Sequence, residues 1–239
     1  MLRGIQGDMI DVHFWPTPNG QKIPIFLEET GLPYRVVPVN IGRGDQFKPE
    51  FLKLSPNNRM PAIVDHAPVD GGEPIAVFES AAILQYLAEK TGRFMPSDVR
   101  GKKTVLEWLA WQIANLGPAC GQLGHFKIYA KDKIPYAIER YSNEVHRLFG
   151  VLDGRLEGRD YVADEYSIAD MAIYPWLRNH ERFGIDVAEF PRASAWLARM
   201  AARPAVARGI DAGKDLPTTS LQDDDEARKH LFGQRARTH

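Results

Sequence analysis

The stretch MPAIVDHAPVDGGEPIAVFES, residues 60–80, decides the fold of this chain. It contains two short apolar runs, residues 61–65 and 74–78, with the length and composition typical of β-strands. The Val-Asp-Gly-Gly sequence between them is a turn signal, so the two runs should pair as an antiparallel hairpin. A helical pattern follows at once, with Ser80 as a candidate N-cap. The stretch therefore predicts a ββα unit.

The residues upstream of this unit predict two further strands, each followed by a helix. Residues 10–15 and 34–39 have strand character, and residues 20–30 and 45–54 have helical spacing. Two strands joined through a helix should run parallel. Pro24 should bend the first helix or cost it a hydrogen bond, unless that helix starts late. The predicted order is β-α-β-α-β-β-α.

The residues downstream have no strand signals. Helical patterns run through residues 98–115, 134–157, 167–178 and 191–202. Ser167 and Asp170 have the spacing of a capping box, which we assign to folding. Tryptophans at helical spacing are expected in the core: Trp108, Trp111, Trp176 and Trp196. We expect three parts: residues 9–92, an all-helical domain at 98–212, and a polar tail at 213–239.

The tail contains the sequence DDDEARKHLFGQ, in which acidic residues precede basic ones. A short helix prefers this order because of its dipole. The polar composition nevertheless favours a tail that is solvated or only loosely docked.

Composition excludes several classes of function. The 239 residues carry 30 basic and 31 acidic side chains, so the net charge of −1 offers no basic face for nucleic acid. No apolar run approaches the roughly 18 residues of a membrane span. The N-terminal MLRGIQGD lacks an apolar signal core, so a cytoplasmic protein is expected. The histidines have no ligand spacing, so no metal is expected.

The turn FWPTPNGQK, residues 14–22, follows the first strand and lacks cysteine, serine and tyrosine. A strand leading into a helix N-terminus is a frequent site for anions. Cys120 is the single cysteine of the chain, and its apolar neighbours favour a small buried side chain over a reactive thiol. A thiol, if one reacts here, must come from elsewhere.

Several motifs together resemble the Nu class of glutathione transferases, the bacterial branch related to the yeast nitrogen-regulating prion protein. They are PTPNGQKI, SPNNRMPAIVD, GGEPIAVFES, QYLAEKTG, IPYAIERY and YSIADMAIYPW. The match runs from about Met9 to Pro204. It implies an α+β thioredoxin-like N-terminal domain followed by an all-α domain. It also implies a cytoplasmic homodimer that uses glutathione, reduced or oxidised, as co-substrate.

The resemblance implies a pocket for each part of glutathione. Glu79 and Ser80 would bind the γ-glutamyl ammonium and carboxylate. Met60, followed by Pro61 in a cis peptide bond, would offer its backbone to the cysteinyl residue. Gln46 would lie near the glycine end.

The resemblance also implies which group acts as the nucleophile, since the turn at residues 14–22 has no cysteine, serine or tyrosine. The reactive sulfur would be the thiol of the bound glutathione. Thr17 and Asn19 would be neutral donors that stabilise its thiolate at a helix N-terminus. None of these pocket residues is positively charged. Arg140, which matches an arginine that the class contributes from the partner subunit, would supply a cation.

Each of these residues also has a plain structural interpretation. Ser80 is a possible helix cap, and Thr-Pro-Asn-Gly is a good turn sequence. Arg140 could pair with Glu139 or Glu144 on a helix surface.

The activity that the resemblance favours is glutathione-dependent reduction of a small or protein disulfide. A conventional transferase that conjugates an electrophile is one alternative. A glutathione-fold binding module without turnover is another, although such a module would not need a complete ligand pocket.

Overall fold

The computed structural model describes residues 9–217 and 224–235. Its four-stranded sheet has the order β2-β1-β3-β4. The strands are β1 (Ile10–Phe14), β2 (Tyr34–Pro38), β3 (Ala62–Asp65) and β4 (Ile75–Phe78). β1 and β2 run parallel, whereas β3 pairs antiparallel with both β1 and β4. The predicted parallel pair and the predicted hairpin are both confirmed.

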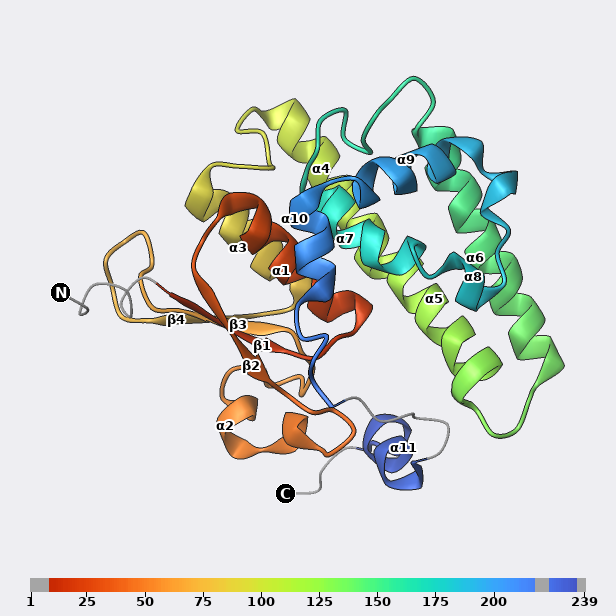
Figure 1. The fold of residues 1–239 in the computed structure, drawn as a ribbon, viewed down its shortest axis with the longest axis horizontal. Helices are drawn as coiled ribbons and strands as arrows, with labels where there is room; N and C mark the ends of the chain where they lie inside the picture. Colours follow the sequence, from red (N-terminus) through yellow and green to blue (C-terminus); the bar gives the residue numbers. More distant parts are fainter. Residues whose placement is uncertain (1–8, 218–223, 236–239) are drawn as a thin grey trace.

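Helix α1 (Pro18–Thr30) lies between the sheet and the helical half of the molecule (Figure 1). It packs on α3 (Ser80–Thr91), α7 (Ile168–Leu177) and α10 (Pro204–Asp211). Gly209 permits the close approach of α10, because a Cβ there would lie 2.5 Å from the backbone nitrogen of Ile25. α1 starts at Pro18, so Pro24 lies inside the helix rather than near its start.

The connection between β2 and β3 is less helical than predicted. Instead of one stretch over residues 45–54, it forms a 3-10 turn, η1 (Asp45–Phe47), and the short helix α2 (Pro49–Leu52). Lys48 adopts an extended backbone between them, as the residue before a proline usually does.

The first helix of the second half is longer than predicted. It runs without a break from α4 (Val99–Trp111) through η2 (Gln112–Leu116) and α5 (Gly117–Gly124) to η3 (His125–Tyr129). Both η2 and η3 are π-helical. Pro118 therefore lies within the helix instead of ending it, and the wider π turn just before it accommodates a residue that has no amide hydrogen.

Further helices complete this half, and three of them overlap the predicted ranges. They are α6 (Pro135–Arg155), α7, α8 (His180–Phe183), η4 (Val187–Glu189), α9 (Pro191–Ala201) and α10. The capping box of Ser167 and Asp170 starts α7 as predicted. Burial raises the pKa of Asp170 to about 6, although four hydrogen bonds, one from the Trp196 indole, favour its charged form.

The expectation of four core tryptophans is confirmed only for Trp196, which is fully buried. Trp108 and Trp111 are half-buried and pack edge to face, with ring centroids 5.1 Å apart. Trp176 is also half-buried, and it lines a pocket. Helical spacing identified a face of each helix, but it does not distinguish the core from a cleft.

The tail carries a docked helix, α11 (Asp225–Phe232), so the prediction of a solvated or loosely docked tail is wrong for these residues. Arg228 donates to the Tyr129 carbonyl at 2.5 Å, and the Phe232 ring packs on His125 at 4.6 Å between centroids. These contacts attach α11 to both the first and the last residue of η3. The remainder of the predicted tail at residues 218–223 and 236–239 lies outside the described residues.

Candidate functional site

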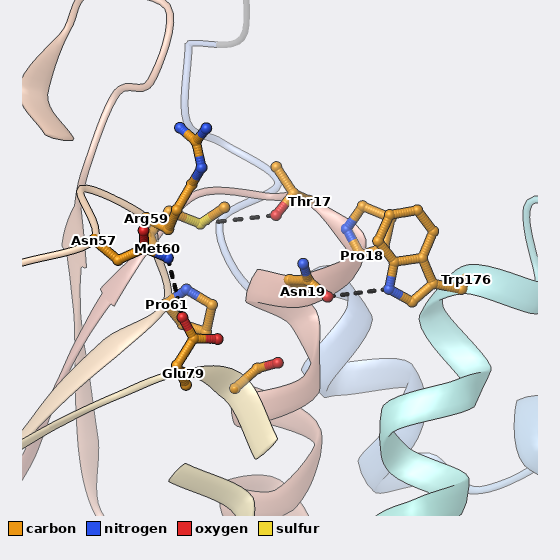
Figure 2. A pocket seen from close by; sticks show the side chains of 10 residues that line it. Thr17, Pro18, Asn19, Asn57, Arg59, Met60, Pro61, Glu79 and Trp176 are labelled. Atoms are coloured by element: carbon orange, nitrogen blue, oxygen red, sulfur yellow. Dashed lines mark hydrogen bonds between the residues drawn. The ribbon is translucent and has the colours of Figure 1, made fainter. Parts of the chain in front are cut away.

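A pocket of about 390 Å³ lies where two helix N-termini face the loop before β3 (Figure 2). α1 contributes its first turn, α3 contributes its start, and α7 contributes one aromatic side chain. The lining residues are Thr17, Pro18, Asn19, Asn57, Arg59, Met60, Pro61, Glu79, Ser80 and Trp176. Six of the residues predicted from the sequence are therefore brought together.

The first turn of α1 holds two of them in fixed positions. The Thr17 hydroxyl caps the helix by accepting from the Gly20 amide at 3.2 Å, and it also contacts the Met60 sulfur at 3.7 Å. Gly20 is required there, because a Cβ would collide with the Trp15 carbonyl oxygen. The Thr-Pro-Asn-Gly sequence is thus a helix start rather than a simple turn.

The Asn19 amide is oriented by Trp176, a residue that the sequence reasoning placed in the core. The indole Nε1 donates to Asn19 Oδ1 at 3.1 Å. An indole nitrogen can only donate, so the oxygen of the amide must face it. The amide nitrogen then lies on the side away from Trp176, and it makes no hydrogen bond within the described chain (Figure 2).

The loop before β3 and the end of β4 form the opposite wall. The Met60–Pro61 peptide bond is cis, as predicted. Glu79 has a φ of 68°, which is uncommon for a residue with a side chain. Its exposed carboxylate accepts from the Asn57 amide at 3.1 Å. Backbone strain of this kind often occurs at functional sites.

Ser80 is the first residue of α3 rather than its N-cap, so that structural interpretation is wrong. Glu79 occupies the cap position and makes no side-chain capping bond, which leaves the first amides of α3 facing the pocket. The Ser80 hydroxyl instead accepts from Lys22 Nζ at 3.1 Å. Lys22 is fully buried behind the pocket wall, and it also donates to Gln112 Oε1 at 2.6 Å.

The expectation that the pocket contains no positive charge within one chain is also wrong. Arg59 lines the pocket, and its guanidinium donates to Gln234 in the C-terminal segment at 2.9 Å. Lys22 lies behind the wall. One signal for Lys22 was present in the sequence, because it precedes Phe26 by four residues and so lies on the buried face of α1.

Gln46 and Arg140 are not among the lining residues. Gln46 is buried, its amide nitrogen donates to the Ile41 carbonyl, and its Oε1 has no partner within the described chain. Arg140 is exposed on α6. Glu144, the suggested surface partner of Arg140, makes two hydrogen bonds to Arg147 instead.

Cys120 is fully buried in α5, and burial raises the pKa of its thiol to about 12. It is therefore not a nucleophile at neutral pH. Within residues 9–217 and 224–235, no cluster of three or more histidine, cysteine or acidic side chains could hold a metal. No helix in these ranges is both long and apolar enough to cross a membrane.

Comparison with known families agrees with the fold and the pocket. The model of the glutathione S-transferase N-terminal domain matches residues 17–90, and that of the C-terminal domain matches residues 116–204. The chain therefore belongs to the glutathione S-transferase family, and its four-stranded mixed sheet with a helical half is the thioredoxin-like fold of that family.

Individual relatives are similar over most of the chain. Disulfide-bond oxidoreductase YfcG of Escherichia coli is 52% identical, across 84% of this chain and 94% of that protein. A glutathione transferase from Burkholderia graminis, solved with two glutathione molecules per subunit, is 44% identical with a TM-score of 0.82. Its alignment covers 87% of this chain and 89% of that structure.

A glutathione transferase from Pseudomonas putida, solved with one glutathione disulfide per subunit, is 42% identical with a TM-score of 0.82. The alignment covers 88% of this chain and 93% of that one. These relatives support the predicted family and the use of glutathione by proteins with this fold.

Proposed function

We propose that this protein reduces disulfides with glutathione, using the thiol of the bound ligand as the nucleophile. The relatives named as disulfide-bond oxidoreductases and the neighbours solved with glutathione or its disulfide support this activity. In the reaction, one glutathione thiolate attacks a disulfide sulfur and releases a thiolate that takes up a proton. A second glutathione attacks the resulting mixed disulfide, giving glutathione disulfide and a second thiol.

The observation that carries the proposal is the amide nitrogen of Asn19, which has no hydrogen-bond partner in residues 9–217 and 224–235. A ligand thiol with a pKa near 8.5 needs a donor to hold it ionised at neutral pH. Trp176 holds the Asn19 amide with its nitrogen available, at the N-terminus of α1. The Thr17 hydroxyl, in contrast, accepts from the Gly20 amide and donates its own hydrogen to the Met60 sulfur. Asn19 is therefore the principal donor, and Thr17 positions the turn.

The other ends of glutathione fit the remaining walls. The γ-glutamyl carboxylate would bind the amides at the start of α3, and its ammonium would bind Glu79. The Met60 backbone would pair with the cysteinyl residue, which directs the glycine end toward Arg59 and the region of Gln46. This orientation places the ligand sulfur between Met60 and the first turn of α1.

We also propose a cytoplasmic homodimer in which Arg140 reaches the pocket of the partner. Large apolar side chains are exposed in both halves of the chain: Val69, Ile75 and Phe78 in the first, Ile134 and Tyr136 in the second. Ile134 and Tyr136 lie at the start of α6, the helix that carries Arg140. A covered apolar surface beside Arg140 would bring that arginine to a second chain.

The test compares two reactions of the purified protein with glutathione. One co-substrate is bis(hydroxyethyl) disulfide, and the other is an activated aryl halide that accepts the thiolate by conjugation. We expect turnover of the disulfide to exceed that of the halide. Conjugation without disulfide reduction would instead support a conventional transferase, and binding of glutathione without either reaction would support a binding module.

A further inference from the structure

Lys22 is a buried lysine that has no counter-ion among the described residues. It is 0% exposed, and its two hydrogen-bond partners, Ser80 Oγ and Gln112 Oε1, are both neutral. It forms no ion pair with any carboxylate of the described chain. Buried charges in proteins are nearly always paired, because their transfer from water is costly. The unpaired ammonium lies directly behind the wall of the pocket.

None of the charged groups around Lys22 in the described chain serves as its counter-ion. Glu79 is the acid that influences it from the start of α3, but its carboxylate is exposed and bound to Asn57. Other acids on α1 and on the elements packed against it have partners of their own: Glu28 with Arg208, Glu29 with Arg203, Glu89 with Lys102, Asp170 with Ser167 and Trp196, Asp11 with Arg35 and His66, and Asp211 with Lys214.

The hydroxyl of Ser80 connects Lys22 to the pocket. Its oxygen accepts a hydrogen bond from Lys22 Nζ, so its own hydrogen is free to donate to a group on the pocket side. The uncapped amides at the start of α3 face the same place. A carboxylate there would accept hydrogen bonds from the amides and from the Ser80 hydroxyl. It would also be attracted electrostatically by Lys22, which has no other counter-ion in the described chain.

We infer that Lys22 is the buried counter-ion of the carboxylate that binds at the start of α3, with the Ser80 hydroxyl as the intermediate contact. In the proposed function this carboxylate belongs to the γ-glutamyl group of glutathione, so the inference rests on that function. Lys22 is a positioning residue, because it acts on the ligand through Ser80.

Binding at this site should take up a proton. Burial lowers the pKa of Lys22 to about 7, and Glu79 only partly offsets this effect. A bound carboxylate favours the charged lysine and raises its pKa again. Above pH 7 the free protein therefore holds Lys22 largely neutral, and the ligand binds together with a proton. Its affinity should fall by up to about tenfold for each pH unit above 7.

The test uses S-methylglutathione, which keeps the carboxylates of glutathione but has no thiol to titrate. Calorimetry in buffers of different ionisation enthalpy gives the protons taken up on binding. We expect a large part of one proton to be taken up near pH 8, and only a small uptake near pH 6, where Lys22 is already charged. Wild-type binding without uptake near pH 8 would overturn the inference and leave the proposed function intact. Failure of the wild type to bind at all would overturn both.

Variants separate this role from a structural one. Lys22→Met should abolish the proton uptake and weaken S-methylglutathione about 30-fold near pH 6, with a smaller difference near pH 8. Ser80→Ala should weaken binding while a reduced uptake persists. The control is Lys127→Met, which removes a half-buried lysine that donates to the Phe183 carbonyl, away from the pocket. It should match the wild type.

Folding of the variants is checked by thermal denaturation. Lys22→Met removes a buried charge but also leaves Gln112 Oε1 without its donor. These two effects on stability have opposite signs, so the variant should melt close to the wild type at pH 6. If it does not fold, Lys22→Gln provides the same comparison with a polar side chain. Wild-type affinity and proton uptake in a folded variant without Lys22 would contradict the inference.

Discussion

The two helix N-termini that form the pocket are built in opposite ways. α1 is capped by the Thr17 side chain, and it presents the Asn19 amide, which Trp176 of α7 holds in place. α3 has no side-chain cap, and behind its first turn lies Lys22. One end therefore offers a single oriented neutral donor, and the other offers uncapped amides with a lysine behind them that becomes fully charged when a carboxylate binds.

This difference suits two kinds of negative charge. The carboxylate of a ligand is charged before it binds, so it can be matched by a buried ammonium and open amides. A thiolate develops on the bound ligand and must remain nucleophilic, because strong stabilisation lowers its reactivity. A neutral amide stabilises it without neutralising it. The α3 end should therefore determine affinity, and the α1 end should determine turnover.

The largest expected effect follows from removal of the α1 donor. Asn19→Ala should lower disulfide turnover about 100-fold or more, because a donor to a developing charge is lost. The affinity for glutathione should change little. Steady-state kinetics with bis(hydroxyethyl) disulfide measure both, and Asn143→Ala on the exposed face of α6 is the control. Unchanged turnover would transfer the donor role to Thr17.

The next largest effect is expected at Arg140, which would bind a carboxylate of the ligand away from both helix N-termini. Arg140→Ala should weaken glutathione disulfide about 30-fold and reduced glutathione less, since the disulfide carries more carboxylates. In a mixed dimer of one Arg140→Ala chain and one Asn19→Ala chain, a crossing Arg140 would place both substitutions in one pocket. The other pocket would carry neither, so about one wild-type site per mixed dimer should be recovered. No recovery, with heterodimers shown to form, would mean that Arg140 acts within its own chain.

Loss of the Asn19 orientation should have a smaller effect than loss of Asn19 itself. Trp176→Phe keeps an aromatic wall but removes the indole donor, and we expect turnover to fall about tenfold, the value of one hydrogen bond. Combined with Asn19→Ala, it should cause no further loss. Trp111→Phe, which alters a half-buried tryptophan outside the pocket, is the control. Additive effects would mean that Trp176 acts independently of Asn19.

The smallest effect is expected at the cysteine. Cys120→Ala should retain full turnover, because the thiol is buried, has a raised pKa and lies apart from the pocket lining. Activity assays and a melting temperature distinguish a catalytic loss from a loss of stability. A folded but inactive variant would contradict the proposal that the ligand supplies the sulfur.

Much of the fold was predictable because its signals are local. The hairpin has a turn sequence between two apolar runs, and the Ser167–Asp170 capping box has a fixed spacing. The pocket residues were predicted through motifs rather than through geometry. The domain boundaries at residues 92 and 98 stay predictions.

The remaining features depend on contacts between distant residues. Lys22 meets Gln112 across 90 positions, and Trp176 meets Asn19 across 157. Neither pair has a local signal. The docking of α11 depends on the ring of Phe232 and the guanidinium of Arg228, two side chains within an otherwise polar segment.

The π-helical stretch η2 places one partner of Lys22 at a register that an ordinary helix would not provide. A π turn holds about one residue more than an α turn, so η2 is equivalent to an insertion in the helix that starts at Val99. Deleting one residue from 113–116 should restore regular winding and rotate Gln112 relative to α5 by about 100°. The position of Gln112 behind the pocket therefore depends on the number of residues in the helix. A substitution leaves that number unchanged, so it should not rotate Gln112 as a deletion would.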